Sequence, residues 1–131
     1  MPHGSHLWSM LTAGLALGLG VLGVFFVFAP TPASSLFGIE APAHADLAYV
    51  RAVGFRDIAL CLAILVVLPM SKPATRRLLA ASALIPACDI ALVLLESGLS
   101  PILPLLLHAA SGAVLLTLSI LGPPDGLPPR H

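Results

Sequence analysis

Charged side chains lie within stretches of this chain that are otherwise apolar and long enough to cross a membrane. The chain has six acidic residues and six Lys or Arg residues, and five of these twelve lie in such stretches, apart from Arg76 and Arg77, which flank a turn. A charged group at the bilayer centre costs roughly 2.5–3.5 kcal/mol on insertion scales, so such residues are candidates for function. The ionisable side chains concerned are Arg51, Arg56, Asp57, Asp89, Glu96 and His108.

These residue types suit acid–base chemistry. An aspartate beside a histidine can act as general base and acid, and a nearby arginine can stabilise an oxyanion that develops during the reaction. The candidate catalytic residues are Asp57, Asp89, His108 and Arg56, and the candidate ligand-binding residues are Arg51, Glu96 and Ser111.

A structural role is the alternative for the same residues. An Arg–Asp pair and a hydrogen-bonded histidine can fix the register of packed helices without any chemistry. This alternative is the stronger one for Arg51 and Glu96, which are expected close to the membrane interface. For Asp57, Asp89 and His108 together we favour a ligand-binding or catalytic role.

Composition identifies a membrane protein. Hydrophobic residues make up 58% of the chain and charged residues 9%, whereas soluble domains contain about 25% charged residues. Four apolar runs cover residues 7–29, 48–70, 73–97 and 101–121, each near the roughly 20 residues that a helix needs to cross a bilayer. They lack the alternation of barrel strands. The sequence therefore predicts an all-α, integral membrane four-helix bundle that forms one domain over residues 1–131.

Other classes of function lack their signals. The net charge is zero and no basic patch is present, so nucleic-acid binding is not expected. A single His in an apolar run, without a second ligand at helical spacing, does not predict a metal site. We expect neither a metal nor a cofactor.

Helical geometry brings the ionisable groups to one depth. At a rise of 1.5 Å per residue, Arg56, Asp57, Asp89 and His108 each lie roughly 12–14 Å below one and the same side of the membrane. Arg56 points about 140° away from Arg51, so both arginines cannot face one centre. Pro86 leaves the carbonyl group of Ser82 without its helical donor, so the backbone there can line a cavity.

The connecting segments predict an orientation. Lys72, Arg76 and Arg77 flank one short turn, which places this turn and both termini in the cytoplasm under the positive-inside rule. Residues 30–47 then face outside. Their apolar residues Leu36, Phe37 and Ile39 can lie on the membrane, fold over the bundle or belong to a plain linker. Residues 43–45 (AHA) resemble a signal-peptidase site, but the long preceding run favours a retained first helix.

Small and aromatic residues also have expected places. Gly14 and Gly18 form a G-x-x-x-G step, which allows close helix packing in lipid. We favour packing within the chain over a homodimer through this step. Trp8 and Tyr49 are expected as anchors at the membrane interface.

Residues 48–60 read AYVRAVGFRDIAL, with an R-x-x-G-x-R-D core that ends at Asp57. This string, the segment with Pro86 and Asp89, and residues 107–110 (LHAA) resemble the small four-helix integral membrane proteins of the domain of unknown function family 4267. The resemblance covers roughly residues 7–121. It implies a four-helix bundle with a polar centre and implies no activity.

These sequence features are compatible with three functions. The first is a membrane protein that binds a lipophilic small molecule in its polar centre, with isomerase- or cyclase-like acid–base catalysis left open. The second is a subunit of a proton-coupled transporter, since buried carboxylates and histidines mark such pathways. The third is an accessory or structural subunit without chemistry of its own.

Overall fold

The computed structural model describes residues 2–39 and 47–123. Throughout these two ranges the secondary structure is helical, with no strand, which confirms the predicted all-α class. The elements are α1 (Pro2–Phe28), α2 (Pro30–Phe37), α3 (Ala48–Met70), α4 (Lys72–Ser82), α5 (Leu84–Ser97) and α6 (Ile102–Leu121).

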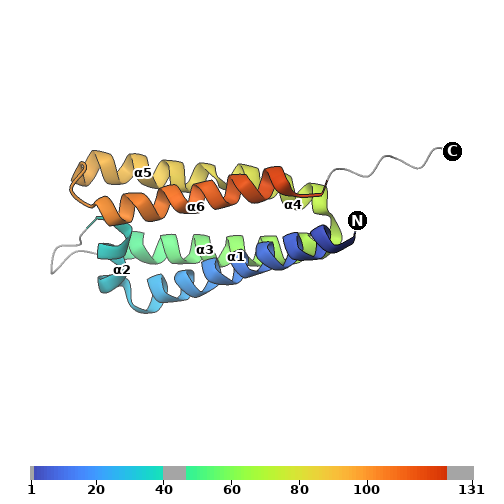
Figure 1. Ribbon diagram of the computed structural model, residues 1–131. Helices are drawn as coiled ribbons and strands as arrows, with labels where there is room; N and C mark the ends of the chain where they lie inside the picture. Colours follow the sequence, from blue (N-terminus) through green and yellow to red (C-terminus); the bar gives the residue numbers. More distant parts are fainter. Residues whose placement is uncertain (1, 40–46, 124–131) are drawn as a thin grey trace.

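Four spans are long and apolar enough to cross a membrane, at Gly4–Phe28, Ala48–Met70, Lys72–Ser97 and Ile102–Leu121. They agree with the predicted runs except that the first begins earlier. Figure 1 shows two hairpins side by side: α1 with α3, and the α4–α5 span with α6. The chain is therefore a helical bundle of the multi-pass membrane type.

The third span is broken at Ala83 between α4 and α5. Pro86 has no N–H group, and its ring conflicts with the carbonyl group four residues earlier, at Ser82. The turn before it tightens, because the Ala83 N–H group donates to Ala80 as well as to Leu79, at 3.3 and 3.2 Å. The break lies between α4 and α5, six residues before Asp89 in the sequence.

Helices α1 and α3 pack closely at two glycines. A Cβ atom at Gly54 would lie 2.6 Å from the Gly23 carbonyl oxygen, and a Cβ atom at Gly23 would lie 2.6 Å from that of Gly54. In contrast, a Cβ atom at Gly14 or Gly18 would meet nothing within 4 Å. The G-x-x-x-G step therefore does not serve packing within the described part of the chain.

Two apolar clusters lie at opposite ends of the bundle. One contains Trp8, Ile64 and Leu115, and the other contains Phe26 and Phe37. Trp8 is 4% exposed, and its Nε1–H group donates to the carbonyl oxygen of Leu118 at 2.8 Å. The ring of Trp8 thus joins α1 to α6, while its expected position at the membrane interface stays a prediction.

Basic residues gather at the end where α1 begins. Lys72 contacts the hydroxyl group of Ser5. Arg76 donates to the carbonyl oxygens of Ser119 and Pro123 at 2.9 and 3.1 Å. It thereby satisfies acceptors that the last turn of α6 would otherwise leave unpaired.

The opposite end is covered by α2 (Pro30–Phe37), which Gly38 caps at its C-terminal end. Gly38 has a φ of 99°, and a Cβ atom there would lie 2.8 Å from Pro104. The Ser97 hydroxyl donates to the Gly38 carbonyl oxygen at 3.0 Å. Of the three alternatives for this connection, the described part folds over the bundle. Residues 40–46, with the possible cleavage site at 43–45, lie outside the described residues.

Candidate functional site

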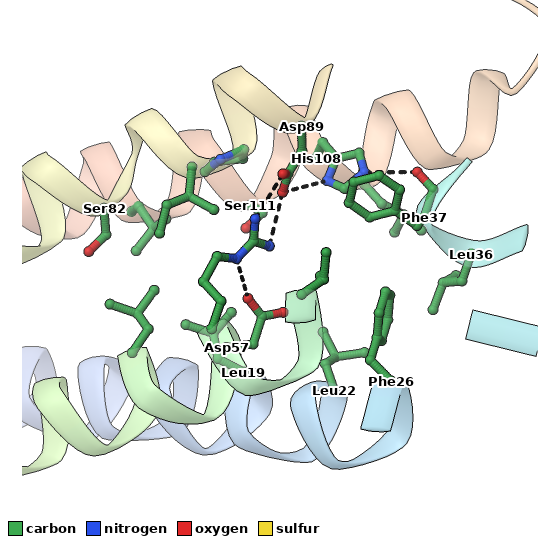
Figure 2. A pocket seen from close by; sticks show the side chains of 17 residues that line it. Leu19, Leu22, Phe26, Leu36, Phe37, Asp57, Ser82, Asp89, His108 and Ser111 are labelled. Carbon is green, nitrogen blue, oxygen red and sulfur yellow. Dashed lines mark hydrogen bonds and ion pairs between the residues drawn. The ribbon is translucent and has the colours of Figure 1, made fainter. Parts of the chain in front are cut away.

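A cavity of about 390 Å³ lies between the two hairpins, bordered by both apolar clusters. This volume is within the range of small-molecule sites. Figure 2 shows polar side chains crossing an otherwise apolar space. The apolar lining is Leu19, Leu22, Phe26, Leu36, Phe37, Val53, Leu60, Ile85, Pro86, Leu107 and Leu115, and the polar lining is Arg56, Asp57, Ser82, Asp89, His108 and Ser111.

Arg56 is the centre of the polar group. Its Nε atom donates to Oδ1 of Asp57 at 3.0 Å, and its Nη1 and Nη2 atoms donate to the two carboxyl oxygens of Asp89 at 2.9 and 3.1 Å. A two-pronged arginine–carboxylate pair combines charge with fixed geometry. The side chains of Asp57 and Asp89 are 12% and 6% exposed, whereas that of Arg56 is 32% exposed. The arginine therefore lies at the rim and reaches inward.

His108 connects this group to α2. Its Nδ1 atom lies 3.7 Å from Oδ2 of Asp89, and its Nε2 atom lies 3.1 Å from the carbonyl oxygen of Phe37. The ring of Phe37 meets the imidazole edge to face, with centroids 5.1 Å apart. Because a carbonyl oxygen only accepts hydrogen bonds, Nε2 must carry a proton. In the neutral ring the lone pair is then on Nδ1.

Helical periodicity explains which side chains meet. Arg56 lies five positions after Arg51, so the two point about 140° apart, and only Arg56 faces the cavity. Pro86 and Asp89 are three residues apart on one face of α5, and both are buried. Ser82, Pro86 and Asp89, spaced by four and three residues, line the same space.

The predicted residues divide into two groups. The structure brings Arg56, Asp57, Asp89, His108 and Ser111 to one cavity. It leaves Arg51 and Glu96 exposed on their helices, outside the cavity lining. The convergence of three spans on one level is confirmed, while the chemical roles of these residues stay predictions.

Sequence reasoning missed the contribution of Phe37. Its carbonyl oxygen holds His108, and its side chain lines the cavity beside Leu36. A signal was present, because Leu36, Phe37 and Ile39 form an apolar patch in a connecting segment. Every residue has a backbone carbonyl oxygen, so residue type alone could not indicate the contact with His108.

The described residues contain no cluster of side chains that could bind a metal ion. No three His, Cys, Asp or Glu side chains there are grouped to hold a metal ion. Both carboxyl oxygens of Asp89 already accept hydrogen bonds from Arg56. The described side chains thus offer hydrogen bonding, charge and proton transfer to a ligand.

Comparison with known proteins gives a family for this arrangement. Residues 16–122 match the domain of unknown function family DUF4267. The chain belongs to this family. The DUF4267 match runs from within α1 to the end of α6, so it includes every residue of the cavity lining. No curated protein and no solved structure matches the chain.

Proposed function

We propose that this DUF4267 protein binds a lipophilic small molecule in the cavity and performs acid–base chemistry on the polar end of that molecule. The observation that carries the proposal is the single polar layer, Arg56, Asp57, Asp89 and His108, in an otherwise apolar cavity. Apolar walls with a few convergent polar groups are typical of ligand sites. An isomerisation or cyclisation needs such groups.

His108 is the proton carrier in this proposal. The bond from Nε2–H to the Phe37 carbonyl oxygen fixes one tautomer, so Nδ1 is the atom that takes a proton. Asp89 lies 3.7 Å from Nδ1 and stabilises the imidazolium ion that forms. Returning this proton to another atom of the same molecule completes an isomerisation.

Arg56 stabilises the negative charge that the substrate acquires. An arginine has five N–H groups, and three of those in Arg56 donate to Asp57 and Asp89. The remaining N–H groups can receive an oxyanion. Because the carboxylates hold the guanidinium before the reaction, little reorganisation is needed during the proton transfer.

Ligand binding can be tested with the protein in lipid nanodiscs and a photoreactive long-chain alcohol. Labelled residues are mapped by peptide mass spectrometry. Ser111→Phe fills the cavity and should abolish labelling of its lining, while Ala110→Phe, on the exposed neighbouring position, should not. Equal labelling of the lining in both variants would contradict the proposal.

Catalysis can be tested by isotope exchange, which needs no knowledge of the product. A molecule that co-purifies with the protein is incubated with it in D₂O. Deuterium should enter carbon positions of the molecule with the wild-type protein and fail to enter them with His108→Gln or Asp89→Asn, both of which should remain folded. Loss of folding in both variants would favour a purely structural role for these residues.

Dimerisation through α1 is a second part of the proposal. Gly14 and Gly18 are exposed and have no neighbour within 4 Å of a Cβ position, so their small size serves no described contact within the chain. Small residues at this spacing allow two helices to approach closely. Gly18→Leu should reduce cross-linked dimer in membranes, and an unchanged yield would reject this interface.

The proposed orientation has both termini in the cytoplasm. Lys72, Arg76 and the start of α1 share one end of the bundle, which supports one common side. A cysteine introduced at Ser100 should react with an impermeant maleimide from outside, and one at Ser71 should not. The reverse pattern would invert the orientation.

A further inference from the structure

The charges in the cavity do not balance. Arg56 is positive, whereas Asp57 and Asp89 are negative, and all three line the cavity. His108 is neutral when only Nε2 carries a proton. The other charged side chains of α3 and α5, Arg51 and Glu96, are exposed and do not line it. With both carboxyl groups ionised and His108 neutral, the cavity contains one surplus negative charge.

The free hydrogen-bonding groups of Asp57, His108 and Ser111 are mainly acceptors. Oδ1 of Asp57 accepts from Arg56, while its second carboxyl oxygen makes no hydrogen bond with a described residue. Nδ1 of His108 has a lone pair and lies too far from Asp89 for a hydrogen bond, at 3.7 Å. The Ser111 hydroxyl, which can donate or accept, lines the same cavity without a described partner. A ligand that donates a hydrogen bond fits these groups.

A ligand carboxylate fits them poorly. The Nη1 and Nη2 atoms of Arg56 already form the two-pronged pair with Asp89, at 2.9 and 3.1 Å (Figure 2). A second carboxylate could form the same two-pronged contact only by displacing Asp89, and would otherwise reach only the two remaining N–H groups of Arg56. It would also raise the surplus from one negative charge to two, in surroundings where charges are weakly screened.

We propose that the cavity selects lipophilic alcohols and amines, whose polar end donates hydrogen bonds and carries no negative charge, and that it excludes fatty carboxylates. This inference rests on the proposed ligand-binding function and names its substrate class. A hydroxyl group lies between Asp57 and His108 and donates its one proton to either of them, whereas an ammonium group donates to both. An ammonium group also cancels the surplus charge.

Proton transfer is consistent with this selectivity. When Nδ1 of His108 takes the proton of a bound alcohol, the O–H electron pair stays on the oxygen and an imidazolium ion forms. The total charge of cavity and ligand is the same before and after this step. An anion that forms inside the cavity is stabilised by the imidazolium ion that forms with it. A ligand that is already an anion before it binds has no such partner and is excluded.

The test uses three photoreactive probes with the same alkyl chain and either a hydroxyl, an amine or a carboxylate end. Each is added to the full chain in nanodiscs of neutral lipid, at an alkaline pH that ionises the carboxylate. The measurement is labelling of the cavity residues Phe37 and Ser111, divided by labelling of lipid-facing Leu17. The hydroxyl and amine probes should exceed the carboxylate probe at least tenfold in this ratio.

The outcomes separate the two proposals. Equal cavity labelling by all three probes would overturn the selectivity and leave ligand binding intact, whereas no cavity labelling by any probe would overturn both. Asp57→Asn removes the surplus charge, so labelling by the carboxylate probe should rise severalfold. If Asp57→Asn fails to fold, the comparison of the three probes on the wild-type protein still tests the selectivity against carboxylates.

Discussion

Arg56 on α3 and Asp89 on α5 form a two-pronged ion pair, with N–O distances of 2.9 and 3.1 Å, that joins the two hairpins across the cavity. Helices α3 and α5 have no extensive contact of their own. The pair therefore spans a gap in the middle of the bundle that apolar packing does not fill.

Replacing Arg56 should destabilise the protein. Arg56→Gln leaves two buried carboxylates without their partner, which we expect to cost about 3 kcal/mol, the lower end for a broken buried pair because Arg56 is partly exposed. Arg56→Lys should cause an intermediate loss, since an ammonium group cannot form the two-pronged contact. Denaturant unfolding in mixed micelles measures both.

Arg51→Gln is the matched control on the same helix. Arg51 is exposed, so its replacement should change the free energy of unfolding by less than about 0.5 kcal/mol. Equal losses for Arg51→Gln and Arg56→Gln would show that the ion pair with Asp89 contributes nothing to stability.

A methyl group at Gly54 should force α1 and α3 apart. Its Cβ atom would lie 2.6 Å from the Gly23 carbonyl oxygen, so Gly54→Ala should cost about 1–3 kcal/mol, as overpacking does. Gly18→Ala, at a position open on all sides, should leave the stability of the monomer unchanged or raise it. Thermal unfolding of both variants in detergent makes the comparison.

Gly38 should be required for the docking of α2. Gly38→Ala combines a positive φ with a Cβ atom 2.8 Å from Pro104, whereas Gly98→Ala has a positive φ and open space. Both substitutions strain the backbone by about 1–3 kcal/mol, and only the first also displaces α2. Cavity labelling by the photoreactive alcohol should fall in Gly38→Ala alone. A similar fall in both would refute a role for α2 in closing the site.

Trp8 is the single tryptophan of the chain, so its fluorescence reports on the α1–α6 contact. A ring 4% exposed should emit at short wavelength and resist quenching by acrylamide. Trp8→Phe should cost about 1 kcal/mol, the net value of the hydrogen bond to Leu118. Efficient quenching would instead indicate the interfacial position expected from residue type.

The spans and the depth of the polar groups could be predicted because both depend on helix geometry alone. A rise of 1.5 Å per residue places Arg56, Asp89 and His108 at one level once the ends of the apolar runs are known. The angle between successive residues also separates Arg56 from Arg51. These arguments need no knowledge of the partners of each side chain.

Contacts between distant segments could not be predicted in this way. The surroundings of Trp8 depend on α6, more than a hundred positions along the chain. The bond from His108 to Phe37 uses a backbone oxygen, which every residue has, so residue type holds no signal for it. Gly20 and Gly23, and not Gly14 and Gly18, form the close contact with α3, because tertiary packing decides which small residues face a neighbour.

Helix α2 closes the cavity although it is too short to cross a bilayer. Leu36 and Phe37 from this helix form part of the wall, while the four spans supply the rest. Substitutions in α2 can therefore reshape one side of the cavity without disturbing the transmembrane scaffold. Under the proposed function, this short segment is where ligand preference can diverge while Arg56, Asp89 and His108 stay the same.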